Sequence, residues 1–377
     1  MDFKFTEQQE LLRKSVREFA EKEILSRVEQ MEETDQEPID LYKQMAKLNL
    51  FGITVPREYG GMGLGLMDRT IVLEEVSRIS ASVGMALQVF QMGISGIQDY
   101  GSEEQKKKYL PLLARGEKFS TMAVTEATGG SDPSGIETSA TLDGDYWVLN
   151  GRKIFITNSH VAEVPVIIAR TSSNPKAFSA FIVEKEFPGF RPGRREKKFG
   201  LHGCNTGEII LEGCKVPKTN LLGKEGDGLK VALKGISEFG RSGMAGVALG
   251  VLNGCLEASK KFATERILYG KPISALQAIQ WHISDIFMDL EISRVLTYRA
   301  AWMRDQGIRC DAELAMAKYY ATEGAVRSSK KAVDIHGGYG YMKEYAVQRH
   351  YRDSQILIAS AGTSEIQRII MARKALS

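Results

Sequence analysis

The chain has 377 residues, of which 43% are hydrophobic and 26% charged, as is typical of soluble globular proteins. Its 50 basic and 47 acidic residues are interleaved, and this balance argues against a nucleic-acid-binding protein. No apolar run reaches the length of a membrane span, and the charged N-terminal stretch MDFKFTEQQELLRK predicts no signal or transit peptide. The 4 cysteines form no CxxC pair, so we expect free thiols in a reducing cytoplasm and no metal site.

The first third of the chain, from about residue 6 to residue 113, has helical periodicity. Thr6 and Gln9 have the spacing of a capping box ahead of the first helix. A glycine-rich loop, YGGMGLG, follows the early helices. Further helices are predicted over MDRTIVLEEVSRIS, SVGMALQVFQMGISGIQDYG and EEQKKKYLPLLARG.

After residue 118 the pattern changes to short runs of β type, separated by turn signals such as DGD and NGR. These runs predict an all-β module, a small barrel or sandwich. From about residue 226 the chain is helical again, with long amphipathic segments and short loops, as in a helix bundle. Near its end, ILIASAGTSEIQR (356–368) is rich in small residues and predicts a tight loop before a helix over IIMARKAL.

Four segments carry residue types that suit ligand binding, although each has a plainer interpretation. VTEATGGSD (124–132) could present backbone N–H groups to a polar ligand or be an ordinary loop. NGRKIFITN (150–158) predicts a turn into a half-buried strand with Phe155 and Thr157 on one side. RILYGKPI (266–273) has an arginine that suits a pyrophosphate, or is a charged helix end. DIHGGYGY (334–341) breaks a helix with glycines, and its histidine is more often structural than catalytic.

The order of these segments resembles that of the acyl-CoA dehydrogenase flavoprotein family, over essentially the whole chain. The segments that carry the resemblance are YGGMGLG, AVTEATGGSDPSGIETSA, NGRKIFITN, GDGLKVAL, ATERILYGKPI, LQAIQ, DIHGGYGY, RHYRDSQI and GTSEIQR. The resemblance implies an α+β multidomain fold: an N-terminal α-helical domain (1–118), a central β-barrel (119–228) and a C-terminal four-helix bundle (229–377). It implies a cytoplasmic FAD-dependent oxidoreductase, usually a homotetramer, that acts on CoA thioesters and reduces electron-transferring flavoprotein.

The same resemblance, carried over position by position, implies the roles of individual side chains. Arg266, Tyr269 and Gln277 would hold FAD across a subunit contact. Asp334, His202 and Leu268 depart from the residues that are usual at their positions. The residues implied for FAD are Val124, Thr125, Phe155, Thr157, Arg266, Tyr269, Gln277, Gly337, Gly338, Thr363 and Glu365. Those implied for substrate are Ser131, Gln91, Glu238 and Arg241.

The most consequential departure concerns the catalytic base. Family members use a glutamate to take the α-proton while the β-hydride goes to flavin N5, and at that position this chain has Ala361. A smaller branch places its glutamate directly before the arginine that corresponds to Arg241, and there this chain has Gly240. A positioned carboxylate contributes roughly 10²–10⁴-fold to such a proton transfer. The base therefore lies elsewhere, or the reaction needs none at that carbon.

Three interpretations remain open on the sequence alone. The first is a dehydrogenase with a relocated base that acts on a cyclic or α,β-unsaturated thioester, such as cyclohex-1-ene-1-carboxyl-CoA, whose γ-proton is acidic. Glu238 is then a weak candidate for the base. The second is a relative of the flavin-dependent oxygenases and oxidases. The third is a catalytically silent flavoprotein, or a Glu→Ala variant of an ordinary short-chain enzyme.

Overall fold

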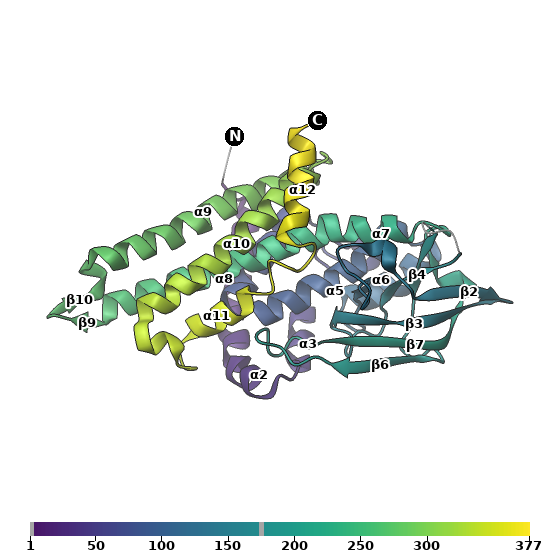
Figure 1. Cartoon of the computed structure of the whole chain (residues 1–377), viewed down its shortest axis with the longest axis horizontal. Helices are drawn as coiled ribbons and strands as arrows, with labels where there is room; N and C mark the ends of the chain where they lie inside the picture. Colours follow the sequence, from purple (N-terminus) through teal and green to yellow (C-terminus); the bar gives the residue numbers. More distant parts are fainter. Residues whose placement is uncertain (1–3, 173–176) are drawn as a thin grey trace.

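The computed structural model describes residues 4–172 and 177–377, and within them a β domain lies between two helical regions (Figure 1). This arrangement confirms the predicted order of helical, β and helical domains. In this part of the chain all 4 cysteines are buried and free. None of the helices described combines the length and the apolar character that crossing a membrane requires.

The N-terminal region is built around two central helices that are buried on most sides. Its first helix begins as predicted, with Thr6 accepting from the Gln9 backbone while the Gln9 side chain accepts from the Thr6 backbone. The helix α5 is lined by apolar and small residues over nearly its whole length and is therefore enclosed by its neighbours. The helices are α1 (Glu7–Phe19), α2 (Val28–Thr34), α3 (Ile39–Lys47), α4 (Leu66–Ile79), α5 (Ala81–Tyr100) and α6 (Glu103–Ala114).

The β domain is a mixed sheet with the strand order β6-β7-β3-β2-β4-β5-β8, and β1 pairs in parallel with β4. Among the residues described, β6 and β8 do not pair with each other, so the sheet stays open and the predicted barrel is wrong. Strand spacing cannot distinguish the two because closure depends on strand tilt and register. The strands are β1 (Met122–Ala123), β2 (Ser139–Asp143), β3 (Tyr146–Thr157), β4 (Val166–Arg170), β5 (Phe178–Ile182), β6 (Phe190–Arg195), β7 (Thr206–Pro217) and β8 (Leu221–Leu222).

The predicted turn at Asn150-Gly151-Arg152 is also wrong, because β3 continues through it. The register against β7 shifts between Leu149 and Gly151, which marks a bulge. A Cβ on Gly151 would lie 2.4 Å from the Thr138 hydroxyl oxygen, so the close approach of Thr138, the residue before β2, requires a glycine there.

Three long helices of the C-terminal region run from the β domain to a small hairpin at the opposite tip of the molecule (Figure 1). They pack against one another, and α4 of the N-terminal region packs against two of them. The elements are α7 (Gly228–Gly235), a π-helical turn (Ile236–Gly240), α8 (Arg241–Glu265), β9 (Ile267–Leu268), β10 (Lys271–Pro272), α9 (Gln277–Asp305), α10 (Asp311–His336), α11 (Ala346–Ser354) and α12 (Ser364–Ala375).

Candidate active site

The two positions at which a base was expected lie in contact with each other. A Cβ built on Gly240 would lie 3.1 Å from the Cβ of Ala361 and 3.6 Å from the Sδ of Met92. Gly240 ends the π-helical turn before α8, and such turns are frequent at functional sites. Ala361 has a positive φ of 53° in the loop before α12. The fold thus brings both positions to one place, and neither side chain there can accept a proton.

Buried polar side chains on α10 and α12 bind the backbone of the loop that carries Ala361. The Lys318 ammonium on α10 is buried and donates to the Ile358 carbonyl at 2.7 Å, and burial lowers the pKa of Lys318 to about 8. The Gln367 amide donates to the Gly362 carbonyl at 2.9 Å. Thr363 caps α12, which begins at Ser364 and therefore earlier than predicted. These bonds fix the loop conformation independently of the residue at 361.

The Glu238 carboxylate, the acidic candidate nearest to this contact in sequence, is engaged elsewhere. It accepts from the Arg304 guanidinium on α9 at 2.7 Å. To accept a proton at the contact between Gly240 and Ala361, the Glu238 carboxylate would first have to leave this ion pair. The assignment of Glu238 as a base therefore stays a prediction, and the geometry gives it no direct support.

Arg241, at the start of α8, is only 9% exposed and donates to the Ser237 hydroxyl at 2.7 Å. Ser237 in turn donates to Asp311 at 3.0 Å. The Nε of Arg241 is buried and has no partner among the residues described, and burial lowers the pKa of Arg241. A buried donor without an acceptor is costly, and this one belongs to the residue directly after Gly240.

A second group of predicted residues lies at an edge of the β domain. Val124 and Thr125 follow β1 and are half-buried, and the Thr125 carbonyl accepts from the Ile154 backbone at 3.0 Å. Phe155 is 61% exposed and has a φ of 55°, in a second bulge that interrupts the alternation of β3. Thr157 is half-buried at the end of that strand, and Ser131 is exposed in the loop between β1 and β2. The aromatic face of Phe155 is thus available to a planar ligand.

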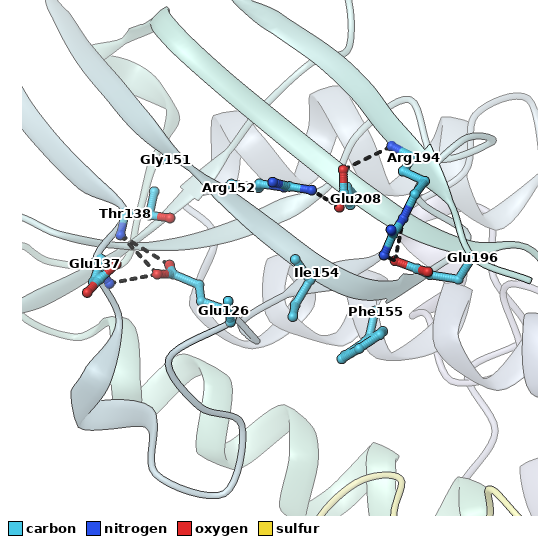
Figure 2. A pocket seen from close by; sticks show the side chains of 11 residues that line it. Glu126, Glu137, Thr138, Gly151, Arg152, Ile154, Phe155, Arg194, Glu196 and Glu208 are labelled. Atoms are coloured by element: carbon cyan, nitrogen blue, oxygen red, sulfur yellow. Dashed lines mark hydrogen bonds and ion pairs between the residues drawn. The ribbon is translucent and has the colours of Figure 1, made fainter.

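A pocket of about 520 Å³ opens beside Phe155 (Figure 2). Several of its charged side chains are paired: Arg152 and the Arg194 backbone both bind Glu208, and the Arg194 side chain donates to Glu196 at 2.8 Å. The Glu126 carboxylate lies at the other end of the pocket. The lining residues are Glu126, Ala127, Glu137, Thr138, Gly151, Arg152, Ile154, Phe155, Arg194, Glu196 and Glu208.

A buried ion pair joins the 124–138 loop to β3. The Lys153 ammonium, with no exposed surface, lies 2.6 Å from Glu126, which also accepts from the backbones of Glu137 and Thr138. Burial lowers the pKa of Lys153 to about 8. Burial raises the pKa of Glu126, but the Lys153 charge and the hydrogen bonds that the carboxylate accepts together outweigh burial and leave that pKa below its usual value. The pair positions Thr125 and Phe155 relative to each other.

Replacing Lys153 with methionine is expected to lower the free energy of unfolding by about 3–5 kcal/mol, because it leaves the Glu126 charge buried and unpaired. Denaturant titration measures the loss. In the double variant K153M/E126Q the amide still accepts from the two backbone groups but carries no charge, so part of the stability should return. A double variant no more stable than K153M would show that the pair does not act through charge.

The third group lies at the far tip of the long helices. Arg266 directly follows α8 as its C-terminal cap residue, and its guanidinium lies 5.3 Å from the centre of the Tyr339 ring. Arg266, Gly337 and Gly338 line one pocket of about 510 Å³. A Cβ added to either glycine would meet nothing within 4 Å, so their backbones face open space. Tyr269 is 90% exposed in the hairpin, and Gln277 is exposed at the start of α9.

His336, which lines the same pocket, has the properties of a structural histidine. Its ring stacks on Phe262 with the ring centres 4.2 Å apart, and its Nδ1 bonds the Ala332 carbonyl at 2.8 Å. Burial lowers its pKa. These contacts fix the end of α10 beside the two glycines.

One chain cannot bring the second and third groups together, because they lie at opposite ends of the molecule (Figure 1). Phe155 belongs to the β domain and Arg266 to the hairpin tip, with the length of α8 between them. Lys153, Lys318 and Arg69 are buried charges that the sequence analysis missed. A lysine within a strand or an arginine within a helix gives no signal of burial until the packing is known.

The pocket beside Gly337 and Gly338 and the exposed ring of Phe155 suit a protein that binds a nucleotide-type cofactor. Three family models match the chain: "Acyl-CoA dehydrogenase, N-terminal domain" over residues 6–117, "middle domain" over 121–214 and "C-terminal domain" over 226–376. The chain belongs to the acyl-CoA dehydrogenase family. FAD is the characteristic cofactor of this family, and the chain is an oxidoreductase.

Relatives align with nearly the whole length of this chain. It is 43% identical to an acyl-CoA dehydrogenase of Bacillus subtilis, over 98% of each chain. It is 40% identical to the caffeyl-CoA reductase-Etf complex subunit CarC of Acetobacterium woodii, over 98% of each chain. The structure of butyryl-CoA dehydrogenase from Megasphaera elsdenii superimposes with a TM-score of 0.97, at 34% identity and over 100% of both chains.

The residues present fit FAD in chemical type. Arg266 supplies a fixed cation beside open glycine backbone at 337 and 338, which suits a pyrophosphate. Phe155 supplies an exposed ring that suits a planar heteroaromatic group. When bound, FAD supplies the acceptor for a hydride.

Proposed function

We propose that this chain is an FAD-dependent oxidoreductase of CoA thioesters whose proton acceptor lies at neither of the two family positions. The observation that carries the proposal is the contact between Gly240 and Ala361, where hydrogen and methyl replace a carboxylate. The rest of the site retains its polar groups, including the buried Arg241.

The proposed substrate is a cyclic or α,β-unsaturated thioester, with cyclohex-1-ene-1-carboxyl-CoA as its model. Its γ-proton is acidic because the charge left behind spreads through the double bond onto the thioester oxygen. A proton lost there does not require a base beside the α-carbon. Removing the usual carboxylate also suppresses the ordinary reaction of saturated chains.

Within this proposal, each group of residues has one task. Val124, Thr125, Phe155 and Thr157 orient the flavin ring, while Arg241 and Ser131 bind the thioester. Gln91 packs behind the acyl group, since its amide is buried and donates to the Leu50 carbonyl at 2.8 Å. Thr363 and Glu365 at the start of α12 bind the remainder of the cofactor, together with Arg266, Tyr269, Gln277, Gly337 and Gly338 from a second copy.

Hydrogen–deuterium exchange tests the position of proton loss directly. The protein with FAD is incubated in D₂O with cyclohex-1-ene-1-carboxyl-CoA and, separately, with butyryl-CoA, and deuterium is located by NMR. We expect deuterium at the γ-carbon of the cyclic thioester and none at the α-carbon of butyryl-CoA. Rapid α-exchange in butyryl-CoA would overturn the proposal, because it requires an ordinary base. The variant E238Q in the same assay shows whether Glu238 takes part.

We also propose a homotetramer in the cytoplasm that exchanges electrons with electron-transferring flavoprotein. The exposed apolar side chains Trp281, Met288, Val295 and Trp302 recur every seventh residue on α9 and form one stripe along it. An exposed apolar stripe of this kind, with Phe287 and Ile292 also exposed on the helix, suits a contact between copies. The Etf complex of the Acetobacterium woodii relative supports the electron partner, and four buried free thiols suit a reducing compartment.

A charge placed in the apolar stripe of α9 should dissociate the oligomer. In Val295→Glu, association would bury an unpaired carboxylate, so we expect a smaller species by light scattering coupled to size exclusion. The control Arg299→Lys alters a half-exposed side chain one turn further along the same helix and keeps the positive charge beside Glu313. An unchanged mass for V295E would place the contact between copies elsewhere.

A further inference from the structure

The guanidinium of Arg69 is completely buried between three helices, far from any carboxylate partner. It lies on α4 with no exposed surface. Its Nε donates to the Gln91 amide oxygen at 2.7 Å and its Nη1 to the Ser242 hydroxyl at 3.0 Å. Its Nη2 has weaker contacts, both at 3.5 Å, to the carbonyl and the amide oxygen of Gln88. Within residues 4–172 and 177–377, no aspartate or glutamate pairs with it.

Burying a guanidinium without a carboxylate partner destabilises the folded state. A buried charge is normally compensated by an opposite charge, and every partner of Arg69 is neutral. Burial accordingly lowers the pKa of Arg69 to about 9. The Phe239 ring, 4.9 Å away, adds a cation–π contact but no negative charge. A brace between the three helices needs only the hydrogen bonds, which an uncharged side chain would provide more cheaply.

The neighbours of Arg69 are the residues that flank the contact between Gly240 and Ala361. Gln91 precedes Met92, whose sulfur lies 3.6 Å from the position of a Cβ on Gly240. Phe239 precedes Gly240, and Ser242 follows it by two residues. The guanidinium thus lies directly behind this contact, which the proposed function makes the place of reaction. Its less satisfied edge, Nη2, faces Gln88, whose own amide nitrogen is held only by the Met85 sulfur at 4.0 Å.

We propose that Arg69 determines specificity by binding an acidic group on the acyl chain, so that the substrate class is a CoA thioester whose acyl group carries a carboxylate at its far end. The carboxylate supplies the counter-charge that the protein does not, and rotation of the loosely held Gln88 amide opens Nη2 to it. Arg69 acts here as a binding residue that touches substrate. This inference rests on the proposed function: it adds to the cyclic or unsaturated acyl group a terminal carboxylate, which the model compound cyclohex-1-ene-1-carboxyl-CoA lacks.

The test compares matched ligands on the FAD-loaded protein. CoA monothioesters of dicarboxylic acids of increasing length are titrated anaerobically, each beside its terminal carboxamide, which is nearly isosteric and neutral. Shifts in the visible flavin spectrum give dissociation constants without requiring turnover. For at least one length we expect the acid to bind on the order of 10- to 100-fold more tightly than the amide, as a charge-assisted hydrogen bond provides. In Arg69→Met the ratio of the two affinities should fall to about one, and this ratio is the readout because the substitution also frees Gln91 and Ser242 and can weaken both ligands alike.

Each other outcome has a definite meaning. Equal affinity for acid and amide at every length in the unmodified protein would overturn the inference and leave the proposed function intact. A preference for the acid that persists in R69M would overturn it as well, by assigning recognition to another residue. If no thioester of any kind perturbs the flavin, both the inference and the proposed function fail. The comparison on the unmodified protein decides the matter even if R69M does not fold.

Discussion

Ala361→Glu will raise the rate at which saturated straight-chain thioesters reduce the flavin by roughly 10²–10⁴-fold, the usual contribution of a positioned general base. The loop already has the required conformation, because Lys318 and Gln367 hold its carbonyl groups. The backbone at 361 has a positive φ that both alanine and glutamate adopt at similar cost. Stopped-flow absorbance with butyryl-CoA measures the gain.

The matched control is Ala361→Gln, which has the same size and cannot accept the proton. A gain in A361E that is absent in A361Q identifies the carboxylate as its cause. Equal rates in the two variants would mean that the side chain only reshapes the pocket. No gain in A361E would contradict the assignment of position 361 as the place where a family base acts.

The second large effect concerns cofactor binding across two copies. Arg266→Ala removes a charge-assisted phosphate contact and is expected to weaken FAD binding by roughly 10- to 100-fold. Phe155→Asn removes the exposed ring and preserves the backbone, because asparagine tolerates a positive φ, and it should weaken binding by about tenfold. Fluorescence titration of the apoprotein with FAD measures both.

Mixed oligomers of the two variants then show whether each FAD is bound by two copies or by one chain. If each FAD contacts the β domain of one copy and the hairpin tip of another, mixing R266A and F155N chains creates some sites with no defect and some with both. The titration should then show a fraction of sites with the original affinity. If all FAD contacts came from one chain, every site in the mixture would keep one defect, and no such fraction would appear.

Much of the fold could be predicted because it depends on local patterns. The capping box at Thr6, the long helices and the change to β-type runs after residue 118 follow from spacing and composition. The closure of the sheet could not be predicted, since it depends on register between strands. The two bulges in β3 were also missed, because they too depend on register between strands. At Gly151, moreover, a glycine after asparagine is a turn signal.

The site was predictable only in part. The absence of glutamate at Gly240 and Ala361 was visible in the sequence, but their contact depends on the packing of two distant segments. The separation of Phe155 from Arg266 likewise depends on the length and direction of α8. Arg69 was not recognised at all, since an arginine in the predicted helix MDRTIVLEEVSRIS has no periodic signature that distinguishes a buried charge from a solvated one.

The most direct test of the central claim is anaerobic bleaching of the bound flavin by a panel of thioesters. The panel contains butyryl-, octanoyl-, cyclohexanecarboxyl- and cyclohexenecarboxyl-CoA, and absorbance is followed in the visible flavin band. We expect fast bleaching by the unsaturated cyclic thioester alone, since only its γ-proton can leave without a carboxylate at Gly240 or Ala361. Fast bleaching by the saturated straight chains would contradict this account, because it would require an ordinary α-base within reach of that contact.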